Sequence, residues 1–412
     1  MTNLPKKTLR IGLIGSGFIA KFHLEALKKV RNVEVVGVYS PTQENRDRFA
    51  TLVSDYELGD CASYGALEYL VTAPNIDALW MLIPNNYRLE AMREIHDLVV
   101  AGKSNLLAIA CEKPLARTLK EAREMLRLAE SAKLNHGYLE NQVFATPVIR
   151  GKEIIWRRAA AATGRPYLAR AAEEHSGPHE AWFWDGQRQG GGVLLDMMCH
   201  SIEVARYLLT DPKAKRSSLK VKNVNGSIAT LKWSNPKYAD QLSKRYPNEI
   251  DYKTKPSEDF ARGIVTYEDE EGNELMVEST TSWAYVGAGL RINLELLGPE
   301  YSMEFNSLNT GLKIFMSREV EGQEGEDLVE KQNAEQGLMP VLEDEAGVYG
   351  YVEENIHMVE CFRKGITPIE TFVDGVEVTK ILMALYRSAE LGTNISLPCS
   401  ELEDYIPTVA RH

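Results

Sequence analysis

Short apolar runs alternate with segments of helical spacing along the first third of the chain. The apolar runs cover residues 9–14, 33–39, 78–83 and 106–111. Each ends at glycine, proline or a polar residue, as buried strands do. Helical spacing of apolar residues is found after Gly17 and at residues 46–53, 89–100 and 119–132. Thr118, with Glu121 three residues on, is the candidate N-cap of the last of these segments. This alternation predicts a parallel, doubly wound sheet, that is, an α/β Rossmann domain over about residues 1–135.

The pattern changes after about residue 136. Runs with strand character, separated by turn residues, follow at residues 227–233, 261–267, 274–283, 291–297 and 312–316. Helical character is found at residues 193–209, 353–363 and 376–391, whereas residues 317–345 are acidic and loop-like. These features predict a second, α+β domain over residues 136–412 with a large open, mostly antiparallel sheet. We expect its C-terminal helix, near residues 376–391, to pack at the domain junction.

Composition narrows the classes of partner. The 412 residues carry a net charge of −12, which argues against binding to nucleic acid or to an anionic membrane surface. The five cysteines are scattered without a C-x-x-C pair, which is typical of a reducing compartment. No apolar run approaches the roughly 20 residues of a transmembrane helix, and the N-terminal run is interrupted too early for a signal peptide. We therefore expect a cytoplasmic protein that acts on a small molecule.

Residues 15–20 read G-S-G-F-I-A, a G-x-G-x-x-A motif between an apolar run and a helical segment. In a dinucleotide-binding turn the first glycine permits the tight turn, and the second lets the backbone approach a pyrophosphate. The N–H groups of the following helix then face the anion. A glycine-rich turn without a ligand is the alternative, but the position of the motif favours a cofactor. The predicted contacts are Gly15, Gly17, Phe18, Ile19 and Ala20.

The end of the second apolar run bears on the choice of cofactor. An acidic residue here usually binds the ribose 2′-hydroxyl of NAD, whereas this chain has Ser40, followed by Pro41 and Thr42. A neutral residue does not repel a 2′-phosphate, and Arg46 could bind one or could be an ordinary solvated residue. We predict NAD as the cofactor, with Ser40 among its contacts, and leave NADP as a possible alternative.

Polar residues follow the later apolar runs of this domain. Pro84-Asn85 ends one run and E-K-P at residues 112–114 ends the next. Asn141, in the segment Y-L-E-N-Q at residues 138–142, follows the last strand expected in this domain. Ligands bind beyond the carboxyl ends of parallel strands. Lys113 could also stabilise charge on a substrate oxygen during hydride transfer, although a lone loop lysine is more often structural. The predicted contacts with the cofactor are Pro84, Asn85, Glu112, Lys113 and Asn141, of which Asn141 could instead contact the substrate.

A triple glycine precedes another candidate pair. Residues 190–200 read G-G-G-V-L-L-D-M-M-C-H, and a helix over residues 193–209 would place Asp196 and His200 on one face. A histidine with a pKa near neutrality can take the proton that a hydroxyl loses as its carbon gives up hydride. A neighbouring carboxylate can orient that histidine. The alternative is an ordinary surface pair or a buried structural histidine.

The sequence resembles the Gfo/Idh/MocA family in three motifs that follow one another along the chain. They are the glycine turn, the E-K-P triplet at residues 112–114 and the glycine-rich segment before His200. This family comprises glucose–fructose oxidoreductase, inositol dehydrogenase and relatives, and the resemblance covers nearly the whole chain. It implies an N-terminal Rossmann domain, an open sheet in the second domain, and a catalytic set of Lys113, Asp196 and His200. It also implies that the nicotinamide lies near Lys113 and Pro84. By family analogy, the open sheet face joins subunits in a homodimer or homotetramer.

Three positions depart from the family pattern. Many members have T-P-N-x-x-H after the third strand, whereas this chain has I-P-N-N-Y-R, with Arg88 in the place of the histidine. The acidic residue after the second strand is missing, and Glu203 stands where aspartate is commoner. The first two departures bear on the cofactor and the pocket, but none removes the predicted catalytic set.

Residues 174–185 carry two histidines, two tryptophans and several carboxylates before the triple glycine. Tryptophans stack on sugar faces, and histidine and aspartate bind hydroxyl groups, so a substrate loop is one interpretation. The histidines could instead share a metal with Glu174 or Glu180, but Gly177-Pro178 breaks the helix that H-x-x-x-H spacing needs, and we predict no metal. A purely structural segment is the third interpretation. The predicted substrate contacts are His175, His179, Trp182, Trp184 and Asp185.

We expect an NAD(P)-dependent oxidoreductase that transfers hydride between a secondary hydroxyl of a sugar, glycoside or cyclitol and nicotinamide. In this mechanism His200 accepts the hydroxyl proton, Asp196 orients the pair and Lys113 stabilises the oxygen. One alternative is a redox-neutral glycosidase that oxidises C3 transiently and needs an extra base, such as Tyr138 or one of the two loop histidines. A second alternative is a non-catalytic, cofactor-sensing regulator on the same fold, against which the intact catalytic set argues.

Overall fold

The computed structural model describes residues 7–247, 249–287, 289–316, 337–341 and 344–411. The chain divides into two compact units. Unit 1 contains Met1–Ala145 and Tyr349–Thr379, and unit 2 contains Thr146–Val348 and Lys380–His412. Residue 135, near which the domain boundary was predicted, is the first residue of a strand of unit 1, so unit 1 extends past it. Unit 1 also includes Tyr349–Thr379, from late in the chain.

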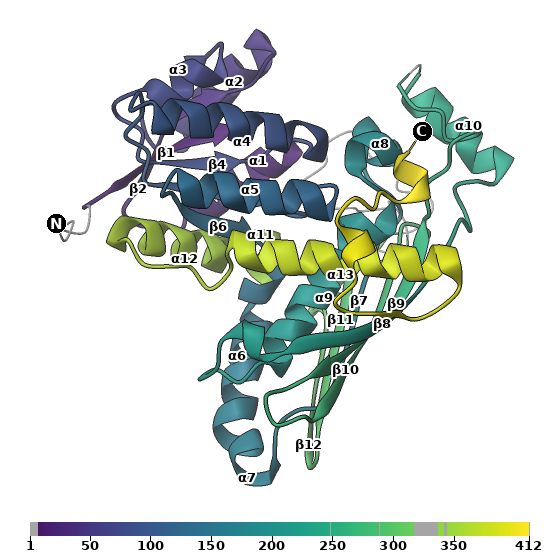
Figure 1. Ribbon diagram of the computed structural model, residues 1–412. Helices are drawn as coiled ribbons and strands as arrows, with labels where there is room; N and C mark the ends of the chain where they lie inside the picture. Colours follow the sequence, from purple (N-terminus) through teal and green to yellow (C-terminus); the bar gives the residue numbers. More distant parts are fainter. Residues whose placement is uncertain (1–6, 248, 288, 317–336, 342–343, 412) are drawn as a thin grey trace. The chain divides into compact units, whose positions relative to one another are not determined.

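A six-stranded parallel sheet lies at the centre of unit 1 (Figure 1). Its strand order, β3-β2-β1-β4-β5-β6, is that of a doubly wound Rossmann sheet. The strands are β1 (Leu9–Ile14), β2 (Val33–Tyr39), β3 (Ala62–Tyr64), β4 (Ala78–Met81), β5 (Ala108–Glu112) and β6 (Asn135–Leu139). Ile14 pairs with Tyr39 on one side and Met81 on the other, so the carboxyl ends of these strands meet at one edge. The predicted parallel, doubly wound sheet is confirmed.

Helices connect these strands and enclose an apolar core. They are α1 (Phe18–Leu27), α2 (Gln43–Asp55), α3 (Leu67–Thr72), α4 (Asn85–Val100), α5 (Leu119–Ser131) and the short η1 (Asn141–Phe144). Fully buried side chains such as Leu79, Met92, Ile109 and Met125 join the strands to α4 and α5. The late segment adds α12 (Tyr351–Lys364), which packs against α1, β1, β6 and η1.

The start of α5 follows the sequence prediction. The hydroxyl of Thr118 accepts a hydrogen bond from the backbone N–H of Glu121 at 3.2 Å. The Glu121 carboxylate in turn accepts from the backbone N–H of Arg117 at 3.1 Å. Glu121 thus binds the backbone N–H of the residue before the N-cap, where a standard capping box binds that of the N-cap itself. The predicted start of the helix is confirmed.

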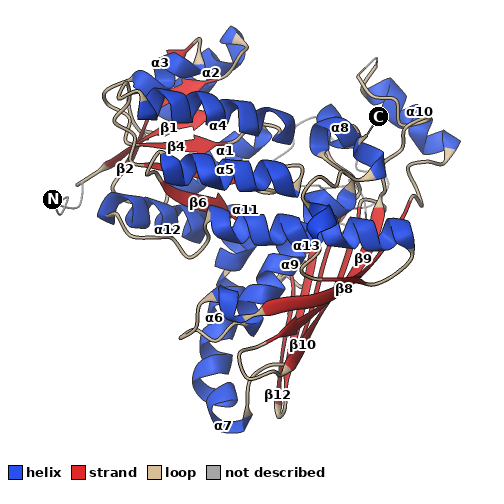
Figure 2. Ribbon diagram, viewed as in Figure 1, coloured by secondary structure: helices blue, strands red, loops and turns tan. Residues whose placement is uncertain are grey.

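Unit 2 is built on a seven-stranded mixed sheet of order β12-β11-β7-β10-β9-β8-β15 (Figure 2). The strands are β7 (Leu168–Glu174), β8 (Lys220–Ala229), β9 (Phe260–Glu268), β10 (Glu274–Ser282), β11 (Arg291–Gly298), β12 (Tyr301–Asn306) and β15 (Ile395–Ser396). Only the pairing of β7 with β10 is parallel within this sheet of the described residues, which agrees with the predicted mostly antiparallel sheet. Helix α9 (Val193–Leu209) packs against β7, β9 and β10, and its bounds match the prediction.

Four strands of this sheet differ from the sequence prediction: β8 differs in its bounds, and β7, β12 and β15 were not predicted. The predicted strand at residues 227–233 instead ends at Ala229, because the backbone N–H groups of residues 231–233 donate to the carboxylate of Asp259. Strand β7 was not predicted, because its sequence, LARAAEE, consists largely of residues that favour helices. Its position between β11 and β10 makes it a central strand all the same.

The remaining elements of unit 2 are short, apart from two helices. They are α6 (Thr146–Ile154), η2 (Ile155–Ala160), α7 (Ala161–Thr163), η3 (Ala181–Trp184), α8 (Gly186–Gln189), η4 (Arg216–Ser218), α10 (Pro236–Arg245), α11 (Glu345–Val348), η5 (Ser400–Leu402) and η6 (Thr408–Ala410). Strands β13 (Leu312–Met316) and β14 (Gly337–Val341) form a separate pair. Of the predicted acidic loop at 317–345, residues 317–336 and 342–343 lie outside the described residues.

Helix α13 (Phe372–Leu391) includes the predicted C-terminal helix and begins four residues before it. The division between the two units falls within this helix, after Thr379. Its packing at the junction stays a prediction. Among the described residues, no helix is long and apolar enough to cross a bilayer. The five cysteines, all within the described ranges, form no disulfide.

Candidate active site

The turn after β1 has the geometry that its glycines predict. The N–H of Gly15 donates to the carbonyl of Tyr39 at 2.8 Å, which joins the end of β1 to the end of β2. Gly15 has a φ of 112°, and a Cβ at this position would lie 2.3 Å from the carbonyl oxygen of Leu82. Only glycine fits there. A Cβ on Gly17, by contrast, would meet no atom of the described residues within 4 Å apart from its chain neighbours, so the backbone before α1 is open to a ligand.

The first turn of α1 suits an anion. Gly17 is its N-cap, no side chain caps the helix, and the first turn contains no acidic residue. The first N–H groups of a helix have no partner within the helix and carry partial positive charge. A hollow of about 380 Å³ lies beside this turn and is lined by Ser16, Lys21 and α2 residues including Asn45 and Arg48. These features fit the diphosphate of a dinucleotide, which supports the predicted contacts at residues 15–20.

The loop after β2 contains the neutral residue that bears on cofactor choice. Ser40 is buried at the strand end. The guanidinium of Arg46 donates from one nitrogen to the carbonyl oxygens of Ser40 and Pro41, both at 3.3 Å. Arg46 therefore binds its own loop, which favours a structural role over the predicted alternative of binding a 2′-phosphate.

Glu112 and His23 form a buried pair at the end of β5. Nε2 of His23 lies 2.9 Å from one carboxylate oxygen of Glu112, and the other oxygen accepts the N–H of Lys113 at 2.9 Å. Burial alone would raise the pKa of Glu112, but the hydrogen bond from His23 and the charges of His23, Lys113 and Arg88 hold that pKa below its usual value. Glu112, predicted to contact the cofactor, is thus an anion that fixes the backbone of Lys113.

His23 is itself held from α12. Its Nδ1 lies 2.9 Å from the amide nitrogen of Asn355, whose oxygen accepts the indole N–H of Trp80 at 3.0 Å. Sequence analysis did not single out His23, because one histidine in an amphipathic helix carries no pattern. The partners lie 89 and 332 residues away in the sequence.

Arg88, the departure from the family motif, lies buried on α4 and binds backbone carbonyls. Nε donates to the carbonyl of Ile83 at 2.9 Å, and Nη1 donates to that of Glu112 at 2.5 Å. Nη1 also donates to the carbonyl of Pro114, and Nη2 donates to that of Lys113 at 3.3 Å. One side chain thus links the loop after β4 with the loop that carries Lys113.

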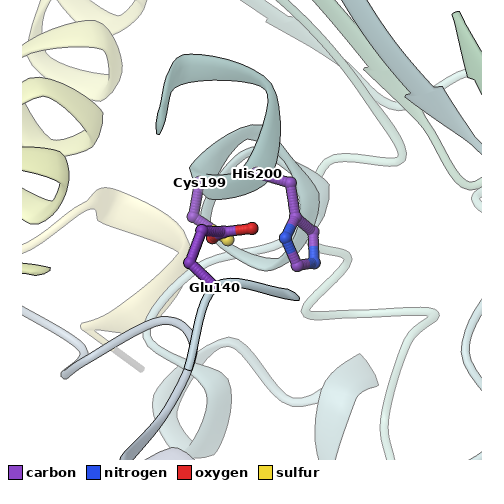
Figure 3. A group of neighbouring side chains, drawn as sticks. All are labelled: Glu140, Cys199 and His200. Atoms are coloured by element: carbon purple, nitrogen blue, oxygen red, sulfur yellow. The ribbon is translucent and has the colours of Figure 1, made fainter. Parts of the chain in front are cut away.

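The other predicted contacts in unit 1 lie at strand ends. Pro84 is the N-cap of α4, and Asn85, its first residue, is buried. Asn141 follows β6 and donates its amide N–H to the carbonyl of Tyr349 at 2.8 Å. Its amide oxygen is buried without a hydrogen-bond partner among the described atoms, so that oxygen remains a candidate acceptor. Glu140, which Figure 3 draws, precedes it and is also buried.

In unit 2, the N-terminus of α9 is held by Glu258 and Tyr386. One carboxylate oxygen of Glu258 accepts from the N–H groups of Gly192 and Leu194 at 3.0 and 3.1 Å, and from the Tyr386 hydroxyl at 2.5 Å. That hydroxyl in turn accepts from the N–H of Gly192 at 2.9 Å. A Cβ on Gly191 would lie 2.1 Å from the hydroxyl oxygen, so the glycine run allows this approach. Burial raises the pKa of Glu258 to about 7, although these hydrogen bonds oppose the rise.

The predicted catalytic residues of unit 2 lie on α9. Asp196, in the first turn, accepts the indole N–H of Trp283 at 3.1 Å. His200, one turn later and also buried, places Nε2 4.0 Å from a carboxylate oxygen of Glu173 on β7. Figure 3 shows His200 next to Cys199 on this helix. An imidazole beside a carboxylate can hold a proton that it takes from a substrate.

The predicted substrate loop contains residues with structural partners. Trp184 is 2% exposed and packs against the rings of Trp233, Tyr252 and Trp283, with centroids 5.0 to 5.3 Å away. The carboxylate of Asp185 caps α8 by accepting two backbone N–H bonds. These contacts favour the structural interpretation for both residues.

The aromatic and histidine residues of the same loop leave more room for a ligand. Trp182 is partly exposed and stacks on Phe183 at 3.8 Å. Nδ1 of buried His175 accepts the N–H of Gly177 at 2.9 Å. His179 is partly exposed, and its carbonyl oxygen accepts the hydroxyl of Tyr246. Trp182 and the two histidines stay candidate substrate contacts.

The structure gathers the predicted site residues into two groups. In unit 1 the glycine turn, Ser40, Pro84 and the E-K-P triplet lie at the carboxyl ends of neighbouring strands. In unit 2 the predicted residues Asp196 and His200 lie on α9, and the helix or its start is in contact with Glu173, Glu258, Trp283 and Tyr386. None of these four was assigned a role from the sequence. That Lys113 meets His200 at one substrate stays a prediction.

Comparison with known proteins agrees with this geometry. A family model described as "Oxidoreductase family, NAD-binding Rossmann fold" matches residues 9–137, and one described as "Oxidoreductase family, C-terminal alpha/beta domain" matches residues 164–397. The chain is 25% identical over 406 residues to D-glucoside 3-dehydrogenase of Escherichia coli strain K12, which covers 96% of this chain and 99% of that protein.

Other similarities are partial in sequence or concern the fold alone. The chain is 32% identical over 209 residues to 1,5-anhydro-D-fructose reductase of Ensifer adhaerens, a match that covers 50% of this chain and 58% of that protein. The crystal structure of GenD2 from gentamicin A biosynthesis, in complex with NAD, aligns with a TM-score of 0.75 at 20% identity and covers 97% of this chain and 99% of that one. On the two family matches, this chain belongs to the Gfo/Idh/MocA oxidoreductase family, with an NAD-binding Rossmann fold and its C-terminal α/β domain.

Proposed function

We propose that this protein is a dehydrogenase that transfers hydride between NAD and a secondary hydroxyl of a sugar, glycoside or cyclitol. The observation that carries the proposal is the buried pair of Asp196 and His200 on α9, in a chain whose other unit is an NAD-binding fold. An imidazole that can take a hydroxyl proton is the group that alcohol oxidation requires.

Glycosides are the substrate class that we favour. The relative that matches over its full length is named D-glucoside 3-dehydrogenase, and glucose-6-phosphate 3-dehydrogenase of Bacillus subtilis is 34% identical over 121 residues. Both names specify oxidation at C3 of a glucose ring. The partly exposed Trp182, on the same loop as the two candidate hydrogen-bonding histidines, suits the flat face and the hydroxyl groups of such a ring.

Four residues of the chain each have one task in this reaction. Bound NAD supplies the carbon that accepts hydride. His200 takes the hydroxyl proton, and Glu173, 4.0 Å from its Nε2, stabilises the resulting imidazolium. Asp196, held by the indole of Trp283, orients the hydroxyl. Lys113 donates a hydrogen bond to the reacting oxygen and stabilises the negative charge that develops there.

The test is a panel of methyl glucosides, D-glucose, D-xylose and myo-inositol, with absorbance of the reduced nicotinamide recorded for NAD and NADP. We expect net reduction of NAD with at least one glycoside or sugar. Glycoside cleavage without net reduction would establish the redox-neutral glycosidase instead. Tight binding of NAD without turnover of any compound would favour the cofactor-sensing regulator.

We further propose that two copies associate through the face of the seven-stranded sheet opposite α9. Charged side chains cross this face, where Arg170 on β7 pairs with Glu278 on β10 and with Glu295 on β11 at 2.8 and 3.0 Å. Met276 on β10 is 41% exposed. Analytical ultracentrifugation should detect a dimer or tetramer, and a monomer at micromolar concentration would reject this proposal.

A further inference from the structure

Three successive carbonyl groups, at the last residue of β5 and in the loop that follows it, converge on one buried cation. The guanidinium of Arg88 donates hydrogen bonds to the carbonyls of Glu112, Lys113 and Pro114. Its Nε donates at 2.9 Å to the carbonyl of Ile83, which ends the β4 region. Arg88 is 4% exposed, so water does not replace these bonds.

Only arginine has the donors for this arrangement. The guanidinium is planar, stays charged and presents five N–H groups in a fixed fork. Here three different nitrogens bind carbonyls on two loops. A lysine ammonium presents its donors from a single atom and cannot reach both loops with the same geometry. Hydrogen bonds to a charged group are stronger than neutral ones, so the loop is firmly held.

The backbone of Lys113 is consequently fixed on both sides. Its carbonyl accepts from Arg88 at 3.3 Å, and its N–H donates to the buried carboxylate of Glu112 at 2.9 Å. Glu112 is in turn held by His23 at 2.9 Å. With both backbone groups occupied, the origin of the Lys113 side chain has little freedom to move.

We propose that Arg88 is a positioning residue for Lys113, a role that rests on the proposed function. Reaction rates are sensitive to displacements of about 1 Å in a catalytic group, which can cost roughly a hundredfold. Arg88 holds the loop at the distance from the sheet at which the ammonium meets the substrate oxygen. The four hydrogen bonds of Arg88 all go to backbone carbonyls, so Arg88 acts on the reaction through Lys113.

The experiment combines single variants with a double-mutant cycle. Turnover of the most active panel compound is measured for Arg88→Ala, Lys113→Ala and the double variant. We expect Arg88→Ala to lower kcat roughly tenfold to a hundredfold, with little change in the Kd for NADH measured by fluorescence. Adding Arg88→Ala to Lys113→Ala should lower kcat no further, because nothing remains to be positioned.

Arg93→Ala is the matched control. Arg93 lies on the same helix, is exposed and pairs with Glu124 at 2.9 Å, so its loss should leave kcat unchanged. If Arg88→Ala does not fold, Arg88→Lys retains the charge and most of the side-chain length and is expected to lower kcat with a circular dichroism spectrum like that of the wild type.

Three outcomes would overturn the inference, and the last of them can be told apart from the first two. If Arg88→Ala and Arg88→Lys keep wild-type kcat, or if Arg88→Ala lowers kcat equally with and without Lys113, Arg88 does not act through Lys113. Normal turnover by Lys113→Ala itself would reject the proposed role of the lysine, and with it the function on which this inference depends.

Discussion

The two units fix their candidate catalytic groups by opposite electrostatic means. In unit 1 a loop follows a strand and presents carbonyl oxygens, and the cation of Arg88 binds them. In unit 2 a helix begins and presents N–H groups, and the carboxyl group of Glu258 binds them together with the Tyr386 hydroxyl. Each side chain matches the backbone groups available at that point of the fold. To fix a catalytic group at the end of a strand or helix, the fold thus needs a side chain from another part of the chain that hydrogen-bonds to the exposed backbone groups.

The two devices differ in their response to pH. An arginine stays charged at every pH that a protein tolerates. Glu258 is different, because burial raises its pKa to about 7. The support of α9 therefore titrates near neutrality, whereas the support of the Lys113 loop does not.

The largest effect should come from removing the chemical groups themselves. Lys113→Ala and His200→Ala should each lower turnover by at least about a hundredfold, the usual scale for a positioned acid–base or electrostatic group. NADH binding, followed by fluorescence, should persist in both variants. Lys103, exposed in the same unit as Lys113, supplies the control Lys103→Ala, which should turn over normally. Near-normal turnover by both test variants would reject the assignment.

Loss of the Glu258 carboxyl group should destabilise the protein. Glu258→Ala leaves the N–H of Leu194 without its acceptor and that of Gly192 with the Tyr386 hydroxyl alone, at a cost of roughly 1–3 kcal/mol for a buried unsatisfied group. Glu258→Gln keeps an acceptor oxygen and should cost less. Urea unfolding of the two variants measures the difference. Equal stability of Glu258→Ala and the wild type would show that this carboxyl group does not support α9.

Removing the charge beside His200 should slow the reaction moderately. Glu173→Gln is expected to lower turnover roughly tenfold, because a neutral partner stabilises the imidazolium less, and one pKa unit corresponds to a factor of ten. Glu174→Gln is the matched control, since Glu174 pairs with Arg291 on β11. If the two variants lose activity equally, Glu173 has no specific relation to His200.

The smallest effect concerns stability as a function of pH. The pKa of Glu258 is raised from 4.5 to about 7 in the folded protein, so the folded state binds this proton more tightly than the unfolded state. Its contribution to stability is therefore present at low pH and is lost as the pH rises from about 4.5 to about 7. Unfolding free energies at about pH 5 and about pH 8 should differ more for the wild type than for Glu258→Gln. A larger difference in the variant would contradict this.

Local signals in the sequence predicted most of the Rossmann unit. The apolar runs became β1 and β2 with the same bounds, and the Thr118 cap and the span of α9 were also predicted. Strand β7 was missed because its alanines and glutamates favour helix, and only pairing with β10 and β11 overrides that preference. Local propensity cannot report such long-range pairing.

The sequence pointed to the candidate reacting groups of the site and not to the residues that hold them, and the roles of the reacting groups stay predictions. Asp196 and His200 could be found from helical spacing beside a glycine run, and Lys113 from its place after an apolar run. Glu258 and Tyr386 lie 66 and 194 residues from Gly192, and nothing in the sequence links them to it. Trp184 shows the opposite case. The composition of its loop suggested a contact with a sugar, whereas its side chain packs against three aromatic rings.

The most direct test is a crystal structure of the protein with NAD and its most active panel compound. Our account predicts that the ammonium of Lys113 and the imidazole of His200 both lie within hydrogen-bond distance of one hydroxyl oxygen. The carbon that bears this hydroxyl should face the nicotinamide ring. A complex in which these two side chains contact different parts of the ligand, or in which either lies away from it, would contradict the account.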